Sequence, residues 1–455
     1  MDNTGFFEKI GQWASRSVSL KLFTIGFLIL LLLIPLAMVQ DLIRERENTR
    51  DEAIREVSSK WGGRQTIGGP VISIPYKYSF RNEKGQIENG IRHAHFLPDE
   101  LKINGIVYPE KRYRGIYIIM LYKADLKIEG KFGALNFNNL SVPKEDYLFD
   151  DAVLSLGISD NKGINDNVEL QGNNLSERFG PGLPCNDIFE SGISLPVSAD
   201  TVDFAFSISL SLNGSTELNF LPFGKVTHVH MESSWPDVKF HGSSLPDSHD
   251  IRSTGFTADW KVLELNRNYP QQGTGNFIPG GRGEYESFES GTNDASAIGM
   301  KLLLPVDEYQ KNMRSAKYGI MFIIITFLSF FFMEILTRRR IHPFQYLLVG
   351  FAVSLFYILL LSISEHLNFN KAYLLSCLSI LLMITSYTAA VFKSRKYAMI
   401  MFGILALLYM FFYSLLQLQD YALLMGSIGL LVMLAVIMYM TRNIDWYRSN
   451  DLKNS

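Results

Sequence analysis

Two hydrophobic patterns divide the chain: long apolar runs toward its ends and short alternating runs between them. A helical run of about 20 apolar residues crosses a bilayer core of roughly 30 Å. By this criterion the sequence predicts six transmembrane helices, at residues 20–39, 318–336, 344–363, 372–392, 397–418 and 421–440. The first run is longer than the apolar core of a signal peptide and lacks a cleavage motif, so we expect an uncleaved anchor.

The region 62–316 alternates with the period of β-strands. From residue 202 to 212 every second residue is apolar, which is typical of a strand with one buried face: Val202, Phe204, Phe206, Ile208, Leu210 and Leu212. Asn213-Gly214 follows and tolerates the positive φ angles of a tight turn, so we predict a hairpin to a strand at 218–220. Further strands are predicted at 71–76, 91–97, 116–128, 152–158, 227–233 and 256–265.

Together these patterns predict a membrane α-helical bundle joined to an all-β domain. The β-sandwich-like domain, residues 62–316, is inserted between transmembrane helices 1 and 2, and a five-helix region follows at 317–440. Residues 1–19 and 441–455 are the expected terminal segments. Apolar residues at helical spacing among mixed charges predict a juxtamembrane helix at 40–61.

Lysine and arginine are distributed unequally around the predicted spans. One side receives most of them, including the topology determinants Arg338, Arg339, Arg340, Lys393, Arg395 and Lys396. The short loops on the other side, 364–371 and 419–420, carry only Lys371. Because short cytoplasmic loops collect basic residues, we expect both termini in the cytoplasm and the β-rich domain outside it.

Composition supports membrane residence and narrows the classes of partner. Charged residues make up 19% of the chain, below the average of about 25%. The formal net charge of -2 argues against a nucleic-acid partner. Cys185 in the polar region and Cys377 in a predicted span are not expected to pair.

Candidate chemistry in the polar region is sparse. His93 and His95 are two residues apart, as are His228 and His230, and such pairs share a strand face. The sequence marks no third ligand, so we predict no metal site and expect solvent-facing histidines opposite the apolar Val229. No catalytic or cofactor motif is present in the sequence, and nothing in it argues for an enzyme.

Polar residues at membrane depth are more informative, because hydrocarbon makes them costly. The candidates are Glu334, Gln345, Glu365 and His366. Arg338 lies four residues after Glu334, and we expect the two to pair. A proton or ion path through these residues is the alternative, although the two glutamates are expected near opposite leaflets.

Long blocks of the sequence resemble the CreD family of bacterial inner-membrane, cell-envelope-integrity proteins. They include FLPFGKVTHVHMESSWPDVKFHGSSLP, GFTADWKV, ITFLSFFFME and RIHPFQYLLVGFAVSLFYILLLSISEHLNFNKAY. The resemblance implies a multi-pass inner-membrane protein, linked to a two-component system and to tolerance of colicin, with a periplasmic domain and no assigned reaction. The expected partners are the lipid bilayer and envelope glycans or proteins. A transporter or channel and a glycan-binding or glycan-modifying module are the alternatives.

Overall fold

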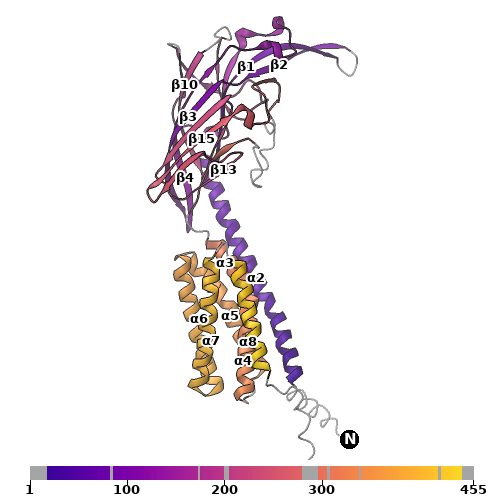
Figure 1. Ribbon diagram of the computed structural model, residues 1–455, viewed down its shortest axis with the longest axis vertical. Helices are drawn as coiled ribbons and strands as arrows, with labels where there is room; N and C mark the ends of the chain where they lie inside the picture. Colours follow the sequence, from indigo (N-terminus) through magenta and orange to yellow (C-terminus); the bar gives the residue numbers. More distant parts are fainter. Residues whose placement is uncertain are drawn as a thin grey trace, which may run out of the picture. The chain divides into compact units, whose positions relative to one another are not determined.

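The chain forms two compact units, one rich in strands and one helical (Figure 1). The computed structural model describes residues 18–81, 86–172, 175–198, 204–278, 296–304, 308–337, 339, 341–418 and 422–442. The β-rich unit is Asp51–Pro305, and the helical unit combines Met1–Arg50 with Val306–Ser455.

The N-terminal helix, α2 (Val18–Trp61), is 44 residues long and covers both the predicted span and the predicted juxtamembrane helix. Its first half is apolar and its second half carries mixed charges. Lys60 Nζ lies 2.8 Å from Glu56 Oε1 one turn away, a spacing that supports an exposed helix. Pro35 lies inside the apolar half.

The rest of the helical unit consists of α3 (Glu308–Lys317), α4 (Gly319–Thr337), α5 (Pro343–Ser364), α6 (Phe369–Phe392), α7 (Arg395–Gln417) and α8 (Ala422–Thr441). Within the described residues, four helices are long and apolar enough to cross a membrane: α2, α5, α6 and α7. The bent pair of α3 and α4, which meet at 43°, makes a fifth if it counts as one crossing. The sixth predicted span coincides with α8, and its crossing stays a prediction.

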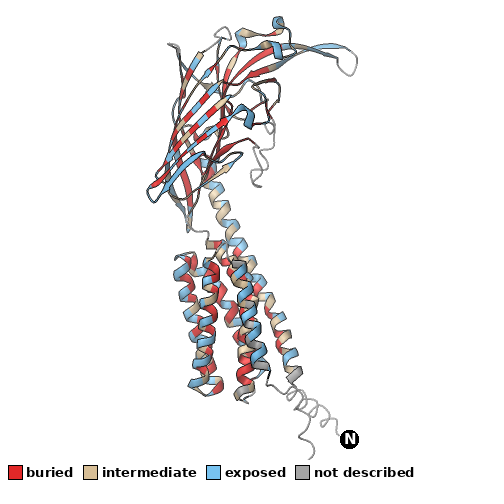
Figure 2. Ribbon diagram, in the orientation of Figure 1, coloured by how far each residue is buried: buried red, intermediate tan, exposed pale blue. Residues whose placement is uncertain are grey.

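The helical unit buries aromatic side chains between its helices and exposes apolar ones outside. Phe322 of α4, Phe356 of α5 and Tyr409 of α7 are at most 2% exposed, and their rings pack against one another in tilted and edge-on pairs. Leu374 of α6 and Leu407 of α7 are 68% and 73% exposed. Such exposed apolar surface suits contact with lipid, as the composition predicts (Figure 2).

The β-rich unit contains two mixed sheets. The nine-stranded sheet follows the order β13 (Val238–Gly242), β17 (Ile298–Leu302), β11 (Glu217–Leu221), β1 (Gln65–Arg81), β5 (Val153–Ile158), β9 (Gly192–Pro196) and β8 (Gly180–Pro181). Strand β2 (Ile87–Phe96) also pairs with β1 and with β16 (Gln272–Thr274). The parallel pair in this sheet joins β1 to β11.

The second sheet has eight strands. Their order is β14 (Ser248–Arg252), β15 (Gly255–Leu263), β12 (Val226–Ser233), β3 (Glu100–Arg114), β4 (Tyr117–Phe132), β10 (Phe204–Ser215), β6 (Glu169–Gly172) and β7 (Leu175–Arg178). Strands β3 and β12 run parallel, and the other neighbours in this sheet pair antiparallel.

One hydrophobic core is shared by the two sheets. It contains Val71 and Leu156 from the first sheet and Ile128, Leu210 and Met231 from the second. Buried and exposed residues alternate along β10 and β15, as the period of two predicts (Figure 2). The sheets therefore pack across a common interior, which is the arrangement of a sandwich.

The predicted hairpin at Asn213-Gly214 is wrong. Both residues continue strand β10, where Gly214 is aligned with Tyr122 of β4, and β11 belongs to the other sheet. A Cβ atom on Gly214 would lie 2.3 Å from the ring of Tyr122. The glycine is thus required by close packing, while the positive φ of 58° falls on Thr216, where the chain changes sheets.

Candidate functional site

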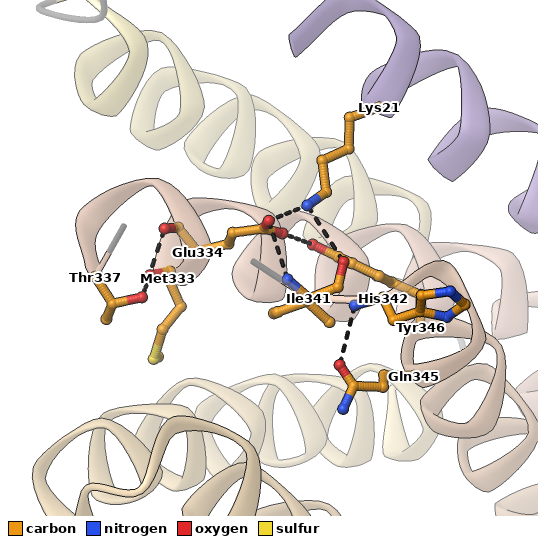
Figure 3. Close-up of polar contacts among 8 residues, drawn as sticks. All are labelled: Lys21, Met333, Glu334, Thr337, Ile341, His342, Gln345 and Tyr346. Atoms are coloured by element: carbon orange, nitrogen blue, oxygen red, sulfur yellow. Dashed lines mark hydrogen bonds and ion pairs between the residues drawn. The ribbon is translucent and has the colours of Figure 1, made fainter. Parts of the chain in front are cut away.

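The most concentrated polar contacts among the sequence-predicted site residues surround Glu334, which is 8% exposed on α4 (Figure 3). Its Oε2 accepts a hydrogen bond from the hydroxyl of Tyr346 at 3.1 Å. Its Oε1 accepts the backbone N–H of Ile341 at 3.1 Å and forms an ion pair with Lys21 of α2. Lys21 also donates to the carbonyl of Ile341 at 3.4 Å.

The turn between α4 and α5 is built around a helix cap. Pro343 is the first residue of α5, where its missing N–H costs no hydrogen bond. His342 Nδ1 accepts the N–H of Phe344 at 3.2 Å, and Gln345 Oε1 accepts the N–H of His342 at 3.0 Å (Figure 3). Gln345 therefore completes a capping box, which accounts for a polar residue near the membrane surface.

The cation that pairs with Glu334 is Lys21, which was not predicted from the sequence. The available signal was a lysine at the second position of the otherwise apolar first span. The expected partner, Arg338, lies outside the described residues, as does Arg340. Arg339 is exposed.

Glu365 and His366 lie at the other end of α5. The Tyr309 hydroxyl donates to Glu365 Oε1 at 3.2 Å, and Arg46 Nε lies 3.9 Å from the same oxygen. His366 is exposed. Twenty residues of helix separate Gln345 from Glu365, about 30 Å at 1.5 Å per residue. The structure thus groups Glu334 with the Gln345 cap and keeps both apart from Glu365.

The Glu334 cluster is chemically suited to holding helices together. A buried carboxylate is costly unless it is paired and hydrogen-bonded, and this one has a cation and two donors. The three partners come from α2, from the α4–α5 turn and from α5. A single carboxylate therefore cross-links three parts of the helical unit.

The histidine pairs of the β-rich unit have different environments. His228 is exposed on β12 opposite buried Val229, as predicted. Hydrogen bonds with Glu232 and Asp259 raise the pKa of His230, and the bond from His230 lowers the pKa of Asp259. His95, by contrast, is 1% exposed, so the expectation of solvent-facing histidines does not extend to the first pair.

These observations define the class of protein: a multi-pass membrane protein with a separate β-rich unit made of two mixed sheets. The chain belongs to the CreD family, because the model of the family "Inner membrane protein CreD" matches residues 17–447. It is 32% identical to the inner membrane protein CreD of Escherichia coli (strain K12) over 425 residues. That similarity covers 92% of this chain and 91% of the relative.

A solved structure with local similarity is an M1 zinc metallopeptidase from Deinococcus radiodurans. The match has a TM-score of 0.18 and 8% sequence identity, and it covers 39% of this chain and 41% of the other. Similarity at this level carries no argument about fold or function.

Proposed function

We propose that this inner-membrane protein supports the integrity of the cell envelope through contacts of a periplasmic β-rich unit, without a catalytic step. In this proposal the helical unit anchors the β-rich unit and both termini lie in the cytoplasm. Family membership supports the inner-membrane location. The family resemblance and the size of the β-rich unit, Asp51–Pro305, support the proposed envelope role.

The observation that carries the proposed topology is the placement of ion pairs within the helical unit. Lys21 and Glu334 hold the start of α2 beside the end of α4, and in the sequence α4 is followed by the arginine run 338–340. Arg46 and Tyr309 both contact Glu365, so α2 leaves and α3 enters the helical unit at its opposite end. The chain thus leaves and re-enters the helical unit at the end away from the Lys21–Glu334 pair, which supports export of the β-rich unit.

The same contacts favour a structural role for Glu334 and Gln345 over transport. Glu334 is held by three partners, and Gln345 caps α5. The distance of about 30 Å along α5 separates them from Glu365 and His366. We propose that Glu334 and Gln345 stabilise the packing of the helices and do not form part of an ion path.

Complementation tests the proposed function. A host lacking its own copy would receive the full chain, or a chain in which residues 62–304 are replaced by a short flexible linker. We expect the full chain to restore resistance to detergent and to colicin, and the helical unit alone to fail. Equal amounts of both proteins in the membrane fraction, measured by immunoblot, are the control.

Restoration by the helical unit alone would overturn the proposal and favour transport. The residue-level control is the quadruple variant Glu334→Gln, Gln345→Leu, Glu365→Gln and His366→Leu. If it accumulates normally in the membrane, we expect it to complement. Loss of complementation at normal abundance would count for an ion path.

A further inference from the structure

A second polar cluster lies in the β-rich unit, between β2 and the loop that joins β8 to β9. His93 and His95 occupy alternate positions of β2, so their side chains share one face of the sheet. The loop brings Cys185 and Asp187 to that face. Residues 92 positions apart in the sequence thus meet at one point, which the strand pattern alone does not predict.

The donor atoms in this cluster are spaced like the ligands of a small cation. One ligand atom each from His93, Cys185 and Asp187 lies within 4.8 Å of the others. His93 Nδ1 is 4.0 Å from Asp187 Oδ2. Zinc bonds of about 2.0–2.3 Å in a tetrahedron put neighbouring ligands roughly 3.5 Å apart. Each ligand–ligand distance would therefore have to shorten by up to about 1.3 Å to close the three residues around an ion.

His95 supports the carboxylate of this cluster. Its Nε2 lies 3.2 Å from Asp187 Oδ2, and its Nδ1 lies 2.9 Å from the hydroxyl of Ser73 on β1. Phe277 stacks on the imidazole with ring centroids 6.1 Å apart. A buried imidazole held on both nitrogens and one face fixes the carboxylate that it contacts, as outer residues of metal sites do.

The cluster borders a cleft that contains an unused polar group. This small cleft, with a volume of about 10 Å³, is about the size of one water molecule and is lined by residues that include Ser73, His95, Cys185 and Ser155 of β5. Ser155 is 4% exposed, and its Oγ has no hydrogen-bond partner among the described residues. A buried hydroxyl without a partner is costly, which points to a ligand or water in this cleft.

We propose that His93, Cys185 and Asp187 bind one zinc ion, with His95 positioning Asp187 and with the fourth coordination position open toward the cleft. The mixed imidazole, thiolate and carboxylate set selects a borderline-soft ion such as zinc over calcium or magnesium, which take oxygen ligands. Three protein ligands and one open position are the arrangement in which zinc holds a water or a small ligand.

Metal analysis of the full chain in detergent micelles tests the proposal. After removal of metal with a chelator, we expect the protein to take up one zinc per chain. Cobalt in its place should give the near-ultraviolet absorption of a thiolate–cobalt bond. His93→Ala, Cys185→Ser and Asp187→Asn should each weaken zinc binding by at least about 100-fold, and His95→Gln by about 10–100-fold.

Two matched controls use the other cysteine and the other histidine pair. Cys377→Ser and the double variant His228→Ala, His230→Ala should bind zinc with the affinity of the wild type. Far-ultraviolet circular dichroism shows whether each variant is folded. The cobalt spectrum is measured on the wild type, so it does not depend on the folding of any variant. Failure to bind zinc stoichiometrically, absence of the thiolate–cobalt band, or unchanged affinity in Cys185→Ser would overturn the proposal.

Discussion

At the residue scale, Lys21 and Glu334 form a partly buried ion pair whose side chains are 26% and 10% exposed. Removing one partner leaves the other charge without compensation in a poorly solvated place, whereas removing both leaves no such charge. The pair is therefore expected to stabilise the helical unit mainly by the penalty that each charge would incur alone. This asymmetry can be measured.

We expect Lys21→Met or Glu334→Gln alone to lower the free energy of unfolding by about 3 kcal/mol. The free energy of unfolding should fall clearly less in the double variant than the sum of the decreases in the two single variants. Equilibrium unfolding in mixed micelles gives the free energy of unfolding of the wild type, of each single variant and of the double variant. The exposed pair Arg44 and Asp41 on α2, 3.2 Å apart, is the control and should contribute under about 1 kcal/mol. Additivity within about 0.5 kcal/mol at positions 21 and 334 would contradict this account.

Residue-scale features of the sequence were informative where one interaction dominates. The predicted spans 318–336 and 344–363 leave a break between two helices, and the structure has α5 starting at Pro343. Glu334 was singled out because a carboxylate at membrane depth is costly. That argument did not identify Lys21 as its partner. Lys21 lies 313 positions away, and only the packing of α2 against α4 and α5 brings the two together.

At the element scale, β12 and β15 are linked on their exposed face by a titratable contact. His230 Nδ1 lies 2.6 Å from Asp259 Oδ1, and Nε2 lies 3.0 Å from Glu232 Oε1. These hydrogen bonds raise the pKa of His230. A raised pKa means that protonated His230 stabilises the fold below its unfolded value of about 6.5, and this contribution disappears as the pH rises through the folded value.

We therefore expect the wild type to exceed His230→Gln in thermal stability by more at about pH 6 than at about pH 9. The effect should be small and should shrink in salt, because the His230 side chain is 38% exposed. His228→Gln, which removes the other exposed-face histidine of β12, is the matched control for the loss of an imidazole from this strand. An equal difference at both pH values would contradict the interpretation.

Element prediction succeeded where strands have one buried face. The alternation at 202–212 lies largely within β10, and the run 227–233 is contained in β12. It failed at Asn213-Gly214, because a glycine that admits a tyrosine ring looks the same in sequence as a glycine that makes a turn. Strand β3 was not predicted, although its 15 residues pair with β4 and β12.

The cluster around His93 shows a different limit of sequence reasoning. Two histidines on one strand face were visible, but Cys185 and Asp187 lie in a loop without a regular pattern. Their approach depends on the pairing of β5 with β1 and β9, which orders the sheet and carries the loop to β2. Pairings between distant strands are set by the whole core rather than by any local signal.

At the scale of the whole molecule, the account depends on which side of the membrane the β-rich unit occupies. Family membership and apolar helices establish an inner-membrane protein. The export of the β-rich unit is inferred from the unequal distribution of basic residues and from the ion pairs at the two ends of the helical unit. The proposed envelope role requires that export.

Reporter fusions measure this directly. Alkaline phosphatase, which is active only outside the cytoplasm, would be joined after Ser234 in the β-rich unit and after Lys393 between α6 and α7. Green fluorescent protein at the same positions supplies the opposite readout. We expect active phosphatase after Ser234 and fluorescence after Lys393. Fluorescence after Ser234 with inactive phosphatase there would place the β-rich unit in the cytoplasm and contradict the account.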